Sequence, residues 1–486
     1  MVEDPRFLST TIESLSEEGA FFPGMNAGGT LPSSFRDPSG FLFTREGILY
    51  RQVNRSYGAF YDHLMQSGLY RELTESSWLV PHAEVDAPPL RADCAYRVIR
   101  PERIPFISHP YEWCFSQLKE AALLTLKIQR RALEAGMSLK DASASNVQFL
   151  NGKPIFIDSL SFERYSEGRP WIAYRQFCQQ FLAPLALMSR RDVRLGRLLQ
   201  IDPAGVPLDL ADSLLPISAW LSPALFLHLH LHAKAQQRLG DQPPPKNPPR
   251  MDRRAFVGLI DHLKGAVDSL RWQPRNTTGW EAYYQQSDYG PEALEQKRRL
   301  VGQFLDQLRP PPRLTWDLGA NTGLFSRMIS SRGILTISID SDAACVERNF
   351  QECVRTGEKN LLPLLIDLAN PSPGLGWAHE ERSSWMDRGP ADLVLALALL
   401  HHLAIANNVP LQRIADLLAK AGRWLIIEFI PKEDPQVQRL LAYRDDIFPD
   451  YSREGFERCL GALFTTRRTE KIQGTERLLY LMERTS

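Results

Sequence analysis

Seven residues of the carboxy-terminal half, Asp317-Leu-Gly-Ala-Asn-Thr-Gly323, have the types and spacing of a loop that holds a small ligand. They follow a short apolar run and precede a segment with helical periodicity. Glycine at 319 and 323 lets the backbone approach a ligand more closely than a Cβ would allow. Asn321 tolerates a left-handed backbone better than most residues. The carboxylate of Asp317 can pair with a cationic group, such as the α-ammonium of a sulfonium cofactor.

Two further carboxylates follow the next apolar runs. Asp340 stands twenty-one residues after Gly319, and Asp367 closes the run 361–366. A carboxylate like Asp340 can accept both ribose hydroxyls, as in dinucleotide sites, and Asp367 is placed to accept from an adenine amino group. A dinucleotide site would instead carry G-x-G-x-x-G and direct a helix terminus at a pyrophosphate. The G-x-N-x-G spacing favours S-adenosylmethionine, which has no phosphate.

The elements that position these residues are apolar runs alternating with helical patterns. We predict strands at 313–317, 334–339, 361–366, 392–397 and 424–429. Strands apolar at nearly every position indicate a parallel sheet with both faces covered. Ligands in such α/β folds bind at the carboxyl ends of the strands, near the switch in strand order.

Residues from about 276 to 485 resemble class I S-adenosylmethionine-dependent methyltransferases, because Asp-Leu-Gly-Ala-Asn-Thr-Gly is a variant of that family's first motif. Asn321 stands where the family more often has glycine. The resemblance implies a Rossmann-like fold with a mostly parallel sheet. It also implies that Gly319, Asn321 and Gly323 line the methionine end, that Asp340 holds the ribose, and that Asp367 reaches the adenine.

Methyl transfer is an in-line displacement, so the protein must chiefly hold the acceptor close to the cofactor. A base is needed only for a protonated acceptor such as a hydroxyl. His401 and His402 follow the fourth strand, and Glu428 ends the fifth, so these three are the catalytic candidates. In the alternative interpretation the two histidines only shape the loop. An aromatic cluster from Trp280 to Tyr289 is either a packed helix or a lid over the site.

A second pattern precedes residue 160. Asp141 is followed five residues later by Asn146, and an apolar strand then ends in Asp158. In kinases such an aspartate orients the hydroxyl, while the asparagine and the second aspartate hold magnesium. Residues 35–235 therefore resemble the protein-kinase and aminoglycoside-phosphotransferase superfamily, which implies an α+β domain that binds ATP and magnesium.

This second pattern departs from the superfamily at several positions. Leu139 replaces the usual histidine, Ser159-Leu160 replaces Phe-Gly, and Arg51 rather than lysine lies in the early hairpin. No glycine-rich phosphate loop is present in the sequence. A scaffold without transfer activity and a chance match both stay open as alternatives.

Amino-acid composition limits the classes of molecule that the protein is expected to bind. The chain has 486 residues, 43% of them hydrophobic, and its 57 basic residues balance 57 acidic ones, which disfavours nucleic acid as a partner. Its acidic start lacks a signal-peptide pattern, its six cysteines are scattered, and no run is apolar enough for a membrane span. We expect a cytoplasmic protein with a small-molecule substrate, no membrane association and no metal site at His228, His230 and His232.

The expected organisation is a kinase-like domain at 35–236, a proline-rich linker at 237–252, and a methyltransferase domain with an amino-terminal helical lid at 253–486. The expected function is methyl transfer to a hydroxyl or amine of a small molecule or biosynthetic intermediate. The kinase-like module would bind a nucleotide or the substrate. The alternatives are a protein or RNA methyltransferase and a regulatory protein that binds S-adenosylmethionine without transfer.

Overall fold

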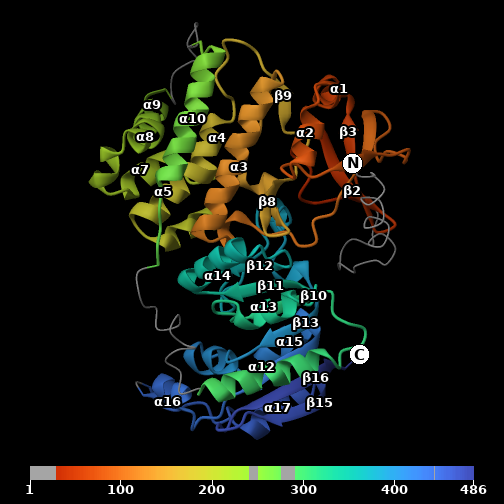
Figure 1. The fold of residues 1–486 in the computed structure, drawn as a ribbon, viewed down its shortest axis with the longest axis vertical. Coiled ribbons are helices and arrows are strands. Elements are labelled where there is room, and N and C mark those ends of the chain that lie inside the picture. The colour runs from red at the N-terminus through yellow and green to blue at the C-terminus, as the bar shows by residue number, and fades with distance from the viewer. Residues whose placement is uncertain (1–28, 240–249, 275–289, 443, 486) are drawn as a thin grey trace, which may run out of the picture.

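The computed structural model of the chain describes residues 29–239, 250–274, 290–442 and 444–485 (Figure 1). Most of the linker predicted at 237–252 lies outside the described residues. The aromatic cluster from Trp280 to Tyr289, interpreted from the sequence as either a packed helix or a lid, lies outside them as well. Both stay predictions.

A seven-stranded sheet forms the carboxy-terminal half, in the order β12-β11-β10-β13-β14-β16-β15. Strands β10 to β14 are parallel and β16 joins them antiparallel. The predicted runs form five of the strands because residues apolar at nearly every position can be buried on both faces. The bounds are β10 (Leu314–Leu318), β11 (Leu335–Asp340), β12 (Leu361–Leu365), β13 (Ala391–Ala396), β14 (Gly422–Phe429), β15 (Phe464–Lys471) and β16 (Leu478–Arg484).

Helices cover both faces of this sheet (Figure 1). Leu393 of β13 packs in one apolar cluster with Phe304 of α12, whereas Val394 packs in another with Ile414 of α15. Neighbouring strand residues point to opposite faces, which explains this alternation. The predicted Rossmann-like α/β fold is confirmed. The helices are α12 (Pro291–Leu305), α13 (Leu324–Ser330), α14 (Ala343–Thr356), α15 (Leu411–Ala421), α16 (Pro435–Leu441) and α17 (Arg453–Gly461).

The amino-terminal half begins with a five-stranded antiparallel sheet in the order β1-β2-β3-β5-β4. The predicted hairpin forms β2 and β3, and its turn places Glu46 and Gly47 at φ 53° and 77°. Leu79, between this sheet's β3 and β4 in sequence, forms only an isolated bridge with Phe156. The strands are β1 (Gly29–Thr30), β2 (Gly40–Arg45), β3 (Ile48–Asn54), β4 (His82–Glu84) and β5 (Ala95–Pro101).

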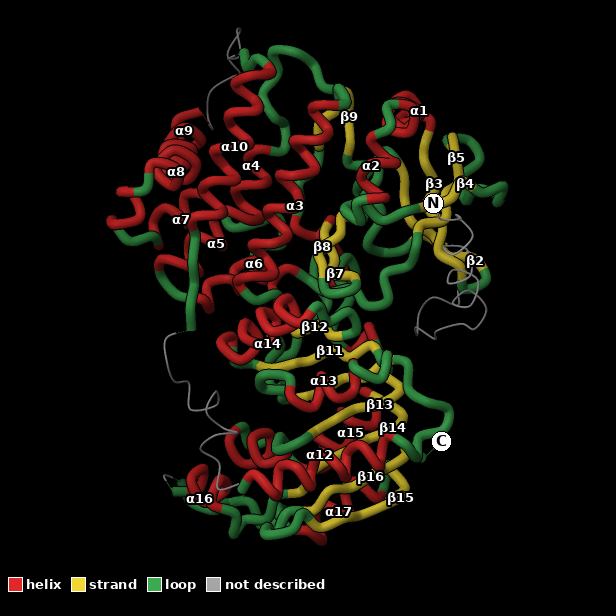
Figure 2. Tube along the Cα trace, in the orientation of Figure 1, coloured by secondary structure: helices red, strands yellow, loops and turns green. Residues whose placement is uncertain are grey.

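A largely helical part follows this sheet, as the colours of Figure 2 make clear. Its longest helix, α3 (Phe115–Glu134), has apolar residues at helical spacing and ends before Gly136, whose φ is 71°. Two short antiparallel strand pairs, β6 (Met137–Leu139) with β9 (Phe162–Arg164) and β7 (Val147–Leu150) with β8 (Lys153–Phe156), flank the kinase-like pattern. Every helix within the described ranges is too short or too polar to span a bilayer.

The remaining helices of this half are α1 (Gly58–Gln66), α2 (Leu69–Glu75), α4 (Tyr174–Phe177), α5 (Ala183–Arg190), α6 (Leu198–Ile201), α7 (Leu208–Leu214), α8 (Pro223–Leu225), α9 (His232–Leu239) and α10 (Arg253–Ser269). Helix α10 packs on α3, where Lys119 Nζ donates to the carbonyls of Asp268 and Leu270 at 3.0 and 2.9 Å. This helix therefore sits with the amino-terminal half, although the predicted limit at residue 253 assigns it to the other.

The two halves share one apolar core. Phe149 of β7 meets Phe350 of α14 edge to face, with 5.8 Å between ring centroids. Nearby, the side-chain amide of Gln117 donates to the carbonyl of Pro363 at 3.0 Å. The backbones also come very close, since a Cβ on Gly152 would lie 2.2 Å from the carbonyl oxygen of Glu358. Such packing fixes the helical half over the carboxyl ends of the parallel strands.

Candidate functional site

The loop between β10 and α13 has the backbone that its residue types favour. Gly319, Asn321 and Gly323 all have positive φ, at 73°, 52° and 80°. The amides of Gly319 and Ala320 both donate to the carbonyl of Ile339 at 2.9 Å, which ties the loop to β11. Two glycines and an asparagine are the residues that adopt this region at least strain.

The two glycines of the loop have different surroundings. Gly319 lies on the wall of a cavity, so backbone is exposed to a ligand there. Gly323 does not line this cavity, and a Cβ on it would lie 2.4 Å from Asn349 Oδ1 of α14. Glycine at 323 is therefore required for close packing of the loop against α14, a constraint that the spacing alone did not reveal.

Asp317 is buried beneath the loop. Its Oδ2 accepts a hydrogen bond from the Ser326 hydroxyl at 2.6 Å. Burial raises the pKa of Asp317 to about 6, and the bond from Ser326 opposes that rise. This carboxyl does not line the cavity, so its expected pairing with a ligand ammonium stays a prediction.

Asp340 and Asp367 do lie on the cavity wall, at the carboxyl ends of β11 and β12. The two oxygens of Asp340 accept the amides of Asn321 and Asp342, at 2.7 and 2.8 Å. Asp367 accepts the amide of Ala369 at 2.9 Å. Burial raises the pKa of Asp340, and these backbone donors partly offset that effect. The fold thus brings both carboxylates to one wall with Gly319 and Asn321.

The cavity has a volume of about 1210 Å³ and lies between the two halves of the chain. One wall, called the lower wall because the carboxy-terminal half lies at the bottom of Figure 1, is formed by the carboxyl ends of β10 to β13. Its opposite wall is formed by residues 188–194, Arg197 and residues 271–274 of the amino-terminal half. Ala398 on the lower wall has φ 53°, a strained conformation of the kind that accumulates at functional sites.

The adjacent histidines of the fourth strand's loop occupy different environments. His402 lines the cavity, and burial lowers its pKa to about 4. His401 is fully buried behind it, with ring centroids 4.0 Å apart, and burial keeps its pKa well below the usual value. Neither ring nitrogen of His401 has a hydrogen-bond partner among the described residues. Only His402 of the pair faces the cavity.

Glu428 is fully buried and does not line the cavity. Its Oε2 accepts from Lys297 Nζ at 2.5 Å, and its Oε1 lies 3.5 Å from Arg477. Lys297 lines the cavity, so Glu428 contacts the site through this lysine. Burial lowers the pKa of Lys297, and Glu428 opposes that fall. The sequence did not single out Lys297, whose helix lies more than a hundred residues before Glu428.

The three residues of the kinase-like pattern come together in the amino-terminal half. The Ser161 hydroxyl links two of them, because it donates to Asp158 Oδ2 at 2.6 Å and accepts from the Asn146 amide at 3.2 Å. Asp141 accepts from the amide of Ser143 and from the side chain of Gln176, each at 2.8 Å. Burial raises the pKa of Asp141.

Arg51 of β3 pairs directly with Asp158, with 2.5 Å between Nη1 and Oδ1. The amide of Leu160 donates to the same oxygen at 2.9 Å. Burial alone would raise the pKa of Asp158, but the charge of Arg51 and these hydrogen bonds lower it. Magnesium needs oxygen ligands that are free to coordinate. The cationic guanidinium of Arg51 lies on Asp158 instead and repels a second cation there, so this arrangement disfavours magnesium with ATP.

The wall opposite the cofactor loop was not predicted. Four arginines at 190, 191, 194 and 197 all line the cavity with Arg271. Their close spacing is visible in the sequence. It has no periodic or motif signal, however, and only the docking of the two halves reveals what these side chains face.

Comparison with known proteins gives one long match. The nodulation protein NoeA of Rhizobium meliloti (strain 1021) is 36% identical over 467 residues, covering 94% of this chain and 96% of NoeA. No protein-family model matches the sequence.

Two solved structures are similar to parts of the chain. The magnesium protoporphyrin IX methyltransferase of Synechocystis PCC 6803 is 20% identical, with a TM-score of 0.31, and covers 43% of this chain and 93% of its own. The bifunctional kinase-methyltransferase WbdD is 18% identical, with a TM-score of 0.31, and covers 45% of each chain.

Proposed function

The chain belongs to the family of the nodulation protein NoeA, and we propose that it transfers a methyl group from S-adenosylmethionine to a hydroxyl or amine of a small molecule. The observation that carries this proposal is the shared cavity wall of Gly319, Asn321, Asp340 and Asp367. These residues meet at the carboxyl ends of parallel strands, where α/β folds bind their ligands.

The donors and acceptors on this wall fit the cofactor. Asp340 already accepts two backbone amides, and a carboxylate has about four lone-pair sites, so it can also accept ribose hydroxyls. The ligand pockets of proteins are about 300–1,000 Å³. A cavity of about 1210 Å³ therefore has room for both a cofactor and an acceptor.

When bound, S-adenosylmethionine supplies an electrophilic methyl group. The protein's part is to orient the acceptor and, for a hydroxyl, to take its proton. His402 is the candidate base because its ring faces the cavity and is neutral above a pKa of about 4. His401 and Glu428 act differently in this proposal, since they support the loop and Lys297 from behind the wall.

We propose that the amino-terminal half contributes to acceptor binding and does not transfer phosphate. The ion pair of Arg51 with Asp158 supports this assignment. The contribution of residues 188–194 and Arg197 to the cavity supports it independently. Of the two roles expected for the kinase-like module, substrate binding is therefore favoured over nucleotide binding.

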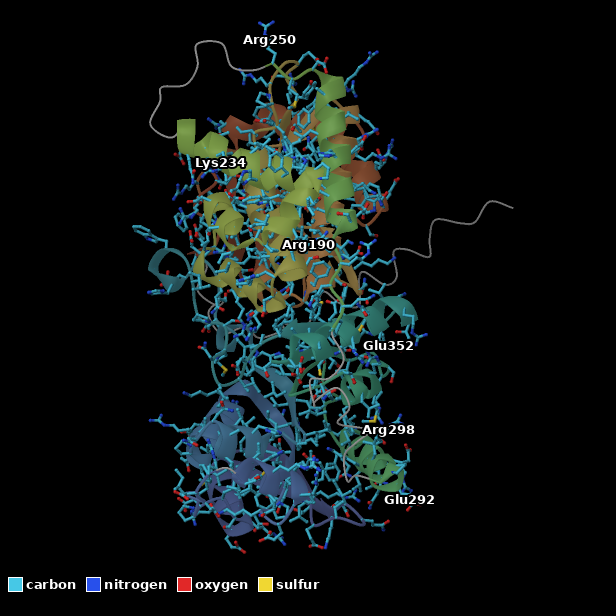
Figure 3. All side chains as sticks on the ribbon, turned by 90° about the vertical axis from the view of Figure 1, so that its left-hand side faces the viewer. Arg190, Lys234, Arg250, Glu292, Arg298 and Glu352 are labelled. Atoms are coloured by element: carbon cyan, nitrogen blue, oxygen red, sulfur yellow. The ribbon has the colours of Figure 1, made fainter. Side chains whose placement is uncertain are left out.

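Calorimetric titration with S-adenosylmethionine tests the cofactor assignment. Asp340→Ala should weaken binding at least about tenfold, because two ribose hydroxyls lose a charged acceptor worth about 1.5–3 kcal/mol. Glu292→Gln is the matched control, since Glu292 is exposed at the start of α12 (Figure 3) and does not line the cavity. Equal affinity in wild type and Asp340→Ala would sink the assignment.

Labelled cofactor and a cell extract distinguish the rival functions. Label recovered in small molecules supports the proposal, whereas label in protein or RNA supports the rival acceptors. Binding without any formation of S-adenosylhomocysteine would indicate a regulatory protein that senses the cofactor. A variant of His402 separates transfer from binding. His402→Ala should slow methyl transfer and leave the affinity for S-adenosylmethionine unchanged.

A further inference from the structure

The cavity wall supplied by the amino-terminal half is strongly basic. It carries five arginines and one acidic residue: Arg190, Arg191, Arg194, Arg197, Arg271 and Asp192. The acidic residues of the opposite wall are Asp340, Asp342 and Asp367, at or just after the ends of β11 and β12. A concave surface lined by charges of one sign concentrates the field inside it. The two walls of the cavity are therefore electrostatically distinct.

Two of the five arginines already have partners. Arg194 forms an ion pair with Asp192, at 2.9 Å from Nε to Oδ1 and 2.7 Å from Nη2 to Oδ2. Arg271 donates to the backbone carbonyls of Asp268 and Leu270. The guanidinium groups of Arg194 and Arg271 therefore already have acceptors within the protein, which is reason enough for their positions.

Three arginines are left for a ligand. Within the described residues, the side chains of Arg190, Arg191 and Arg197 make no hydrogen bond or ion pair. All three are exposed to the cavity or its mouth. Figure 3 places Arg190 in the amino-terminal half, toward the carboxy-terminal half.

Stabilisation of helix ends does not explain why all three of these residues are arginines. Arg190 ends α5, where a cation can interact favourably with the helix dipole. Arg191 lies beyond that helix, and Arg197 ends a separate 3₁₀ helix, Val193–Arg197. Guanidinium groups present donors in a fork that matches carboxylate and phosphate oxygens. The local geometry thus points to an oxyanion.

We propose that Arg190, Arg191 and Arg197 bind an anionic group, a carboxylate or a phosphate, of the methyl acceptor. This inference rests on the proposed methyltransferase function, because the same cavity then holds cofactor and acceptor. Asp340 and Asp367 hold the cofactor from the lower wall, and the arginines hold the acceptor from the upper wall. The amino-terminal half thereby selects the substrate of the carboxy-terminal half.

The test is a titration of inorganic phosphate and, separately, of acetate into the full chain, once saturated with S-adenosylhomocysteine and once without cofactor. The product cofactor fills its own subsite, so the added anion reports on the remaining space. The variant is R190Q/R191Q/R197Q. The matched control is R71Q/R169Q/R254Q, which removes the same charge from exposed arginines that do not line the cavity.

Wild type and the control should bind the anion, and R190Q/R191Q/R197Q should bind it at least about tenfold more weakly. Preference for phosphate over acetate would identify a phosphorylated acceptor, and the reverse preference a carboxylate. The single variant R197Q should lie between wild type and the triple variant. Unchanged circular dichroism verifies that each variant is folded.

Three results would overturn the inference. Wild type could bind neither anion, or the triple variant could bind as well as wild type. The triple variant could instead lose affinity for S-adenosylmethionine together with the anion, and the arginines would then serve the cofactor. Failure of wild type to bind S-adenosylmethionine would refute the proposed function alone, because the anion titration is also read without cofactor.

Discussion

Arg388 and Glu112 form a buried, two-pronged ion pair that joins the two halves of the chain. Arg388 Nη2 lies 2.6 Å from Glu112 Oε1, and its Nη1 lies 2.8 Å from Oε2. The side chains are 4% and 0% exposed. A second link is the His109 ring, 3.0 Å from the carbonyl of Ser383. These contacts help to hold the arginines of residues 190–197 opposite Gly319 and Asp340 across the cavity.

Arg388→Met should lower the free energy of unfolding by about 3–5 kcal/mol, because Glu112 would stay buried without its partner. Urea denaturation at neutral pH measures the change. The control is Arg423→Met, which breaks an ion pair with Glu483 in which the arginine is 54% exposed. That substitution should change stability by about 1 kcal/mol or less. Similar effects of the two substitutions would contradict a structural role for the buried pair.

Glu112 also predicts a pH dependence. Burial raises the pKa of this carboxyl, but the charge and hydrogen bonds of Arg388, together with His109 and Ser372, outweigh burial and hold the pKa at about 2, against an ordinary value of 4.5. A carboxyl whose pKa is lower in the folded state stabilises the fold fully above its unfolded value. The stabilisation is then lost as pH falls from 4.5 toward 2.

Unfolding free energies measured across this acidic range test the prediction. Glu112→Gln removes the titrating group, so its stability should change less with pH than that of wild type. The curves should differ most above the ordinary pKa of 4.5. Parallel curves for the two proteins would show that Glu112 titrates alike in the folded and unfolded chain.

The kinase-like module gives a third prediction. Titration of ATP with magnesium should give no saturable binding in wild type, because the positive charge of Arg51 lies against Asp158 and opposes a metal cation there. The comparison is Asp158→Asn, which removes the carboxylate that a metal would need. Binding in wild type that disappears in Asp158→Asn would overturn the assignment and restore nucleotide binding.

Sequence alone predicted the parts of the structure that depend on local signals. Strands β10 to β14 are runs of apolar residues, and the turn at Asn321 is set by its own backbone preference. Each of these features is determined within a few residues, so no knowledge of distant packing was needed.

Features that depend on docking could not be predicted. Arg190 and Asp340 are 150 residues apart in sequence, yet they line one cavity. Lys297 and Glu428 come from different elements, and nothing in either segment indicates that they pair. The sequence also cannot rank His401 against His402, since the turn after β13 decides which ring faces the cavity.

The two histidines should therefore respond oppositely to substitution. His402→Ala should reduce methyl transfer and leave stability nearly unchanged, because its ring lies on the cavity wall. His401→Leu should keep or raise stability. Its two ring nitrogens are buried without partners among the described residues, and each such group costs about 1–3 kcal/mol.

Thermal unfolding and transfer of labelled methyl groups to extract acceptors, measured on both variants, give the comparison. A large loss of transfer in His401→Leu with normal transfer in His402→Ala would reverse the assignment. The residue behind the wall would then be the one that reaches the acceptor, which would require the loop after β13 to rearrange when ligands bind.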